Sequence, residues 1–85
     1  MARIRIYSTA RCPICDNTKK LLTKWNMSYD EVRVDQSTTG LKEMQEITNG
    51  ARTVPQIVID GRWIGGFTEL TELHMDGELE DLEGS

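Results

Sequence analysis

The chain has 85 residues and a net charge of −4, because 14 aspartates and glutamates outweigh 10 lysines and arginines. A chain of this length forms one domain, which we place over residues 1–85. The negative balance argues against binding to nucleic acid or to an anionic membrane. No apolar run approaches the roughly 20 residues of a membrane span, and the N-terminus lacks the apolar block of a secretory signal, so we expect a cytoplasmic protein.

The first predicted elements are a strand and a helix. Residues 3–7 alternate between charged and apolar side chains, which is typical of a strand. A helix is expected to start at Pro13, because proline suits the first helical position, and to end at Asn26. One face of this helix carries a stripe of residues at the spacing of a helix that packs on a core: Thr18, Leu21, Leu22 and Trp25.

A second strand and helix follow. Residues 29–34 predict a short strand with Val32 and Val34 on one side. Thr38 or Thr39 is expected to cap the next helix, which should end at Asn49-Gly50. The predicted apolar stripe of this helix consists of Leu41, Met44 and Ile47.

The last third predicts a hairpin and a helix. Ile57-Val58-Ile59 indicates a strand buried on both faces. Asp60-Gly61 is a strong hairpin turn, from which residues 62–64 return antiparallel. A third helix is expected from near Thr68 to Gly77, with Leu70 and Leu73 inward. Further on, Leu79 and Leu82 are expected to pin a last turn to the surface.

This order, β-α-β-α-β-β-α, predicts an α/β fold. The first strand–helix–strand unit requires a parallel pair of strands, since its crossover is a helix. The hairpin adds an antiparallel pair. We therefore predict a small four-stranded mixed sheet flanked by three helices.

The only two cysteines, Cys12 and Cys15, lie where the first strand gives way to the first helix. A disulfide across so short a loop removes little chain entropy, about 2 kcal/mol, so a purely structural role is a weak explanation. Structural zinc needs four ligands, and the only histidine is the distant His74. A Cys-x-x-Cys pair between a strand and a helix is instead typical of a redox dithiol.

The helix N-terminus predicts different roles for the two thiols. Cys12 lies where unpaired N–H groups and the positive helix end favour an anion, and Arg11 and Lys19 add positive charge. We therefore expect the pKa of the Cys12 thiol to be lowered, and Cys15, one turn further in, to be less exposed and closer to an ordinary thiol. Cys12 would then attack and Cys15 would resolve the mixed disulfide.

Two features flank the predicted hairpin. Pro55, in Thr53-Val54-Pro55-Gln56, is either a strand-initiating proline or part of a cis peptide bond, and sequence physics does not choose. Gly65-Gly66 precedes the third helix, and a helix N-terminus after glycine favours a bound carboxylate. Trp63, beside this turn, is either a platform for a substrate or a ring that packs its face on a helix, and the second is the more common arrangement.

Together these motifs resemble those of the glutaredoxins. The resemblance rests on Ile6-Tyr7-Ser8 leading to Cys12-Pro13-Ile14-Cys15, on residues 53–61, and on Ile64-Gly65-Gly66-Phe67, and it extends to about Leu73. It implies a thioredoxin-like fold with sheet order 2-1-3-4 and a cis Pro55 facing the active site. It also implies a monomer that holds no metal, uses glutathione as reductant, and reduces protein–glutathione mixed disulfides and protein disulfides.

The resemblance also implies a set of site residues. Cys12 is the nucleophile and Cys15 its partner. Arg52 meets the glycine carboxylate of glutathione, and Arg11 is a further cation beside the site. Backbone groups of the Thr53-Val54-Pro55 segment pair with the glutathione cysteine, and the γ-glutamyl end is held by Gly66, Thr68 and Glu69.

The chain departs from the common family pattern at several positions. Ile14 stands where the family often has tyrosine, Thr9 where it often has lysine, and Thr68-Glu69 where it frequently has Asp-Asp. The loss of the tyrosine hydroxyl favours an alternative function, a dimer that carries a [2Fe–2S] cluster with glutathione. A glutaredoxin-like electron donor served by thioredoxin reductase is a third possibility, which failure to turn over with glutathione would indicate.

Overall fold

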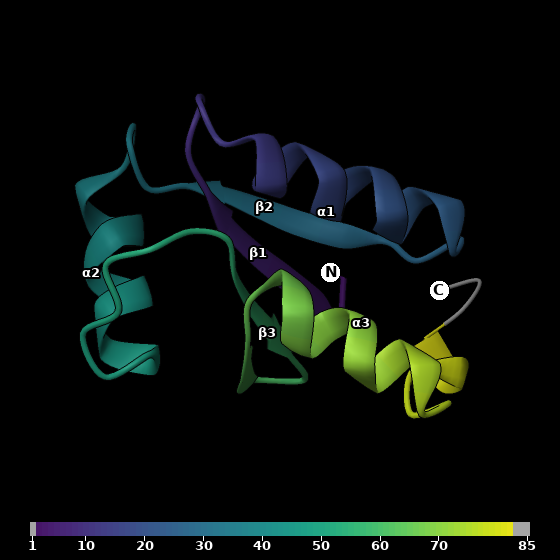
Figure 1. The fold of residues 1–85 in the computed structure, drawn as a ribbon. Helices are drawn as coiled ribbons and strands as arrows, with labels where there is room; N and C mark the ends of the chain where they lie inside the picture. The colour runs from purple at the N-terminus through teal and green to yellow at the C-terminus, as the bar shows by residue number, and fades with distance from the viewer. Residues whose placement is uncertain (1, 83–85) are drawn as a thin grey trace.

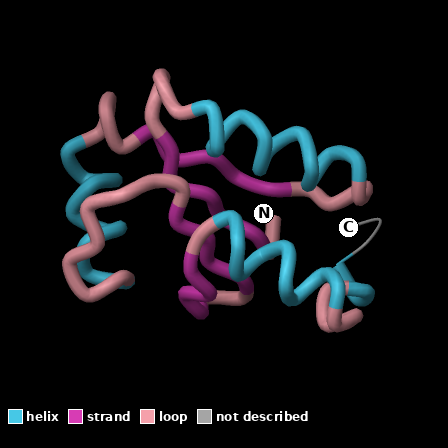
Figure 2. The backbone as a smooth tube through the Cα atoms, in the orientation of Figure 1, coloured by secondary structure: helices cyan, strands magenta, loops and turns pink. Residues whose placement is uncertain are grey.

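A computed structural model of the chain describes residues 2–82, so the two ends of the predicted domain, Met1 and residues 83–85, lie outside the described residues. The elements follow the predicted order: β1 (Ile4–Ser8), α1 (Pro13–Lys24), β2 (Tyr29–Arg33), α2 (Thr38–Ile47), β3 (Gln56–Ile59), β4 (Arg62–Gly65), α3 (Phe67–Met75) and a final 3-10 turn, η1 (Glu80–Leu82). Helices, strands and loops are distinguished in Figure 2.

The four strands form one mixed sheet in the order β2-β1-β3-β4, as predicted. β1 runs parallel to β2, with Ile6 opposite Glu31, and antiparallel to β3, with Ile6 opposite Ile57. β4 pairs antiparallel with β3, and the register is irregular between Ile57 and Val58. β2 and β4 are therefore the outer strands, and β1 and β3 the buried ones.

Each face of the sheet packs on different helices (Figure 1). Because side chains alternate along a strand, Ile57 and Val58 of β3 point to opposite faces. Tyr7 and Val58 pack with Met44 of α2. The other face joins β1 and β3 to α1, α3 and the C-terminal turn through Ile4, Ile6, Leu22, Met27, Ile57, Leu70, Leu79 and Leu82. The predictions that β3 is buried on both faces and that Leu79 and Leu82 hold the last turn are confirmed.

Two details of α2 differ from the prediction. Its N-cap is Ser37 rather than Thr38 or Thr39, because the Ser37 hydroxyl accepts the N–H of Gly40 at 2.9 Å. Gly40 lies so close to β2 that a Cβ would stand 2.6 Å from Val32 Cγ1, which brings the start of α2 against the sheet. Leu41 is exposed rather than part of the buried stripe.

The ends of the described chain are tied together by side chains. Arg3 pairs with Asp60 at 2.6 Å, in the β3–β4 turn, and with Asp81 at 3.1 Å, in η1. Trp25, after α1, stacks on His74 of α3 with ring centroids 3.7 Å apart. Within residues 2–82, no helix is long and apolar enough to cross a bilayer.

Candidate active site

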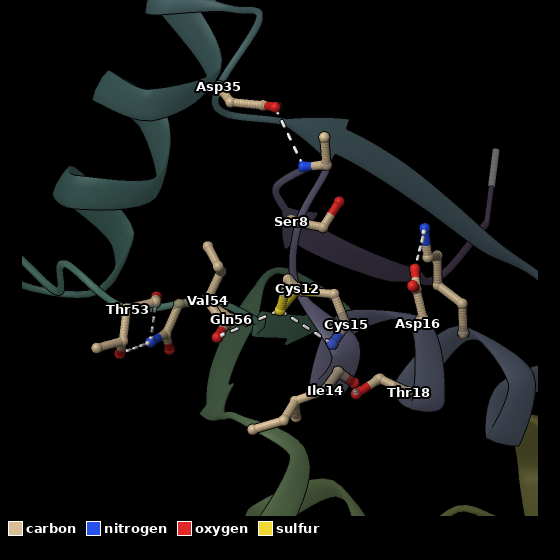
Figure 3. Close-up of a disulfide and its surroundings, with 12 residues drawn as sticks. Ser8, Cys12, Ile14, Cys15, Asp16, Thr18, Asp35, Thr53, Val54 and Gln56 are labelled. Carbon is tan, nitrogen blue, oxygen red and sulfur yellow. Dashed lines mark hydrogen bonds and ion pairs between the residues drawn. A yellow bond between two sulfur atoms is a disulfide. The ribbon is translucent and has the colours of Figure 1, made fainter.

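Cys12 and Cys15 form a disulfide at the N-terminus of α1, with Cα atoms 5.1 Å apart (Figure 3). Cys12 is the N-cap and Pro13 the first helical residue, as predicted. Cys12 keeps 9 % of its surface exposed and Cys15 none, so Cys12 is the more accessible of the two residues. The N–H of Cys15 donates to Cys12 Sγ at 3.0 Å, which places a donor where a thiolate would form.

The loop before Cys12 is held by Asp35, a residue that the sequence did not indicate. Asp35 Oδ2 accepts the N–H of Ala10 at 3.1 Å (Figure 3). Arg33, at the end of β2, donates to both oxygens of Asp35, at 3.0 and 2.8 Å. These bonds lower the pKa of the Asp35 carboxyl from 3.8 to about 2. The end of β2 thus anchors the loop that carries the nucleophile.

Lys19 does not serve the nucleophile as expected. Its ammonium group pairs with Glu31 at 2.8 Å and with Asp16 at 3.6 Å. Glu31 also accepts the hydroxyl of Ser8 at 2.5 Å, and the bond from Lys19 lowers the pKa of Glu31. The positive charge of Lys19 is therefore neutralised between α1 and β2, and Arg11 is the basic residue adjacent to Cys12.

The segment before β3 lies beside the reacting sulfur. The Val54–Pro55 peptide bond is cis, which decides the alternative that the sequence left open. The Val54 carbonyl oxygen lies 3.8 Å from Cys12 Sγ, and Pro55 is buried. The backbone of Val54 is therefore in position to align a molecule whose sulfur meets Cys12.

A groove of about 840 Å³ runs along this segment to the start of α3. Six predicted binding residues line it together: Thr53, Val54, Pro55, Gly66, Thr68 and Glu69. Its walls also include Ile14, Asn17, Trp63 and Phe67, which the sequence did not assign to a site. Trp63 is 42 % exposed, lines the groove and donates its indole N–H to Gln56 Oε1 at 2.9 Å, which favours the substrate platform of the two alternatives for this residue.

The N-terminus of α3 is capped by a side chain of its own first turn. Glu69 Oε1 accepts the N–H of Gly66, the N-cap, at 2.7 Å. The Glu69 carboxylate lies under Gly65, whose φ of +116° and lack of a Cβ make room for it. One oxygen of Glu69 therefore holds the helix end, which leaves the other for a ligand.

The two predicted arginines lie outside the groove. Arg52 lines a neighbouring cleft of about 400 Å³ with Thr9 and Asp35. Val54 lines both the groove and this cleft, so a ligand that crosses Val54 reaches both. Arg11 is exposed and lines neither of the two.

Comparison with known proteins assigns this arrangement to a family. The family model described as Glutaredoxin matches residues 4–64. A glutaredoxin of Neisseria meningitidis serogroup A is 40 % identical over 83 residues, covering 96 % of both chains. Glutaredoxin 3 of Escherichia coli K12 is 38 % identical over 82 residues, covering 96 % of this chain and 98 % of that protein.

The chain belongs to the glutaredoxin family. The crystal structure of a buckwheat glutaredoxin–glutathione complex has a TM-score of 0.81 and 30 % identity, covering 95 % of this chain and 76 % of that one. This glutaredoxin is of the dithiol type: a glutathione-dependent thiol–disulfide oxidoreductase with a thioredoxin fold and a redox-active disulfide. The family, fold and activity implied by the sequence motifs are confirmed.

Proposed function

We propose that this oxidoreductase removes glutathione from proteins by attack of Cys12, with glutathione bound across Val54. The observation that carries the proposal is the position of Cys12 Sγ. It accepts the N–H of Cys15 at the N-terminus of α1, lies 3.8 Å from the Val54 carbonyl oxygen, and is the more exposed of the two sulfurs. An activated thiolate and an aligning backbone thus meet at one edge of the groove.

The Cys12 thiolate attacks the glutathione sulfur of a protein–glutathione mixed disulfide. A Cys12–glutathione bond forms, and the protein sulfur leaves as a thiolate that takes a proton from water. A second glutathione thiolate then attacks the bound glutathione sulfur, releasing glutathione disulfide and the Cys12 thiolate. With a protein disulfide as substrate, Cys15 attacks Cys12 in the mixed disulfide and the Cys12–Cys15 bond forms.

The groove supports one orientation of the tripeptide. Its cysteine lies along Val54, whose N–H donates no backbone hydrogen bond among residues 2–82. Its γ-glutamyl carboxylate meets the backbone N–H groups of Phe67 and Thr68, since the N–H of Gly66 already donates to Glu69, and the free oxygen of Glu69 accepts from its ammonium group. Its glycine carboxylate reaches Arg52, which has no ion pair with a described residue, in the cleft across Val54.

The protein acts as a monomer in this proposal, since all these groups come from one chain, and it holds no resident metal. The alternative of a dimeric [2Fe–2S] carrier predicts a coloured protein. Anaerobic purification followed by a visible spectrum distinguishes the two, because cluster absorption bands would favour the carrier and a colourless active protein the reductase.

The test is an assay with glutathione, glutathione reductase and a glutathionylated protein, run beside the reduction of a protein disulfide. We expect Cys12→Ser to lose both activities. Cys15→Ser should keep the first, because glutathione itself resolves the intermediate, and lose most of the second. Residual turnover in Cys12→Ser, or loss of the first activity in Cys15→Ser, would contradict the assigned roles.

A further inference from the structure

Trp63 is a large aromatic side chain that is partly exposed to solvent. It lies on β4, an outer strand, and 42 % of its surface is exposed. Its indole N–H already donates to Gln56 Oε1 at 2.9 Å, so the polar group of the ring has its partner inside the protein. The ring therefore presents mainly apolar carbon to the groove, and such aromatic surfaces are frequent at protein contacts.

Gln56 fixes the direction of this ring. Its side-chain amide is nearly buried, at 6 % exposure, and both the nitrogen and the oxygen of the amide have partners. Nε2 donates to the Thr53 carbonyl oxygen at 2.9 Å and to Thr53 Oγ1 at 3.1 Å, while Oε1 accepts from Trp63 (Figure 3 shows the two bonds to Thr53). A buried amide that is hydrogen-bonded through both its nitrogen and its oxygen holds its partners in place. The indole is thus tied to the segment that aligns the substrate.

A second exposed apolar side chain lines the same groove. Ile14 lies two residues after Cys12 and is 52 % exposed. Glutathione has no large apolar side chain, and the proposed orientation directs its charged ends to Arg52 and to the start of α3. Apolar area of this kind gains free energy from contact with an apolar group that glutathione lacks. A polypeptide substrate supplies such a group.

We propose that Trp63 is a specificity-determining residue for protein disulfides, contacting a large aliphatic or aromatic side chain beside the cysteine that Cys12 attacks. The polypeptide lies extended along Thr53 and Val54, in the place that glutathione takes in the other reaction. Gln56 is the positioning residue for the indole. The groove is continuous with the reacting sulfur through Val54, so one segment reaches both. This inference rests on the proposed attack by Cys12 and adds the chemical class of the protein substrate.

The reaction on this substrate is balanced without a further reagent. The Cys12 thiolate attacks the nearer substrate sulfur, the substrate disulfide breaks, and its second sulfur leaves as a thiolate. The Cys15 thiolate then attacks Cys12 Sγ and releases the first substrate sulfur. Two electrons pass from the dithiol to the substrate, and the two protons lost by Cys12 and Cys15 reach the substrate thiols through water.

The test uses two oxidised peptides, each closed by one intramolecular disulfide and differing only in Leu or Ser before the first cysteine. We expect the reduced protein to react with the Leu peptide about ten-fold faster at low peptide concentration. Trp63→Ala should remove this preference, and Trp63→Phe, which keeps an aromatic face, should retain most of it. Met75→Ala, an exposed apolar residue outside the groove, should leave both rates unchanged.

Several outcomes would overturn the inference. Equal rates with the two peptides in the unmodified protein, or a preference that survives in Trp63→Ala, would remove Trp63 as a determinant. The mixed disulfide of glutathione and 2-mercaptoethanol separates this failure from a failure of the proposed function. If the unmodified protein reduces it but shows no peptide preference, only the inference on Trp63 fails. If the protein reduces neither it nor the peptides, the attack by Cys12 fails too.

Discussion

The N-termini of α1 and α3 both border the groove, yet the two helices are capped in opposite ways. At α1 the cap is Cys12, whose own sulfur accepts the N–H of Cys15. At α3 the same position is Gly66, which has no side chain, and Glu69 from the first turn accepts its N–H instead. The reacting atom itself occupies the first helix end, whereas at the second Glu69 accepts one N–H and the N–H groups of Phe67 and Thr68 have no backbone partner among residues 2–82.

This difference separates chemistry from recognition. A helix N-terminus stabilises whichever negative group lies closest to it. At α1 that group is the thiolate of Cys12, which belongs to the protein. At α3 the Glu69 carboxylate accepts only the N–H of Gly66, so the N–H groups of Phe67 and Thr68 are left for the carboxylate of a substrate. A helix N-terminus therefore activates the nucleophile at one end of the groove and binds the ligand at the other.

The largest effect that would test this comparison concerns the reduced thiols. We expect the pKa of the Cys12 thiol to lie below that of Cys15, because only Cys12 caps the helix. At neutral pH a larger fraction of Cys12 is therefore thiolate. Alkylation rates measured against pH on Cys12→Ser and Cys15→Ser give each value separately. Equal midpoints would mean that the cap at α1 does not activate its sulfur.

A substitution at Gly65 should disturb the cap at the N-terminus of α3. Alanine there combines a φ of +116° with a Cβ only 2.6 Å from Glu69 Oε1, so the capping carboxylate must move. Gly50→Ala is the matched control, since its φ is +89° and no atom lies within 4 Å of the added Cβ. We expect Gly65→Ala to lose about 1 kcal/mol more unfolding free energy than the control, measured in urea, because it also loses a cap. Equal losses would show that the carboxylate contributes nothing there.

Arg52→Ala removes a cation from the cleft on the other side of Val54. We expect about a ten-fold higher Michaelis constant for glutathione, because the glycine carboxylate loses a charge-assisted bond, and little change in the alkylation of Cys12. Arg62→Ala removes the same charge from β4, outside both clefts, and should leave the constant unchanged. An unchanged constant in Arg52→Ala would remove this residue from the site and make Arg11 the next candidate.

The smallest expected effect is the pH dependence contributed by Asp35, which anchors the loop before α1. Its pKa is lowered from 3.8 to about 2 by Arg33, so the folded state favours the ionised carboxylate. The resulting stability is present above the unfolded value and is lost as the pH falls through about 2. Asp35→Asn should therefore flatten the fall in unfolding free energy between about pH 4 and pH 2. Asp30→Asn, on the outer strand β2, is the control, and an equal change in both variants would contradict the prediction.

Local patterns were enough to predict the order of the elements. Pro13 at the first helical position, the positive φ of Asn26 and Gly77, and the burial of Ile57 and Val58 depend on neighbours in sequence or on strand period, and each agrees with the structure. The sheet order and the cis bond at Pro55 came only from the resemblance to glutaredoxins. The spacing of apolar residues does not distinguish this strand order from other orders, or a cis from a trans peptide bond at Pro55.

The errors concern side chains whose partners are remote in the sequence. Lys19 was placed near the nucleophile because it lies on the same helix, but Glu31 on β2 reaches it first. Asp35 gave no signal, since its bond to Ala10 spans 25 positions. For Trp63, packing on a helix is the more common of two arrangements, and the sequence gives no sign that its indole N–H bonds to Gln56. Such pairings depend on the packing of strands and helices that are distant in the sequence, and local sequence patterns do not encode that packing.

The two outer strands affect how the protein behaves when it is concentrated. An open strand edge is a template on which a second chain can add, the first step of aggregation. β2 is rich in charged residues, Asp30, Glu31 and Arg33, and charge on an edge strand is one of the ways in which proteins discourage such addition. β4 has four residues and pairs irregularly with β3, which offers a foreign strand a short and uneven template. Both outer strands of the sheet therefore discourage the addition of a second chain and the growth of fibres.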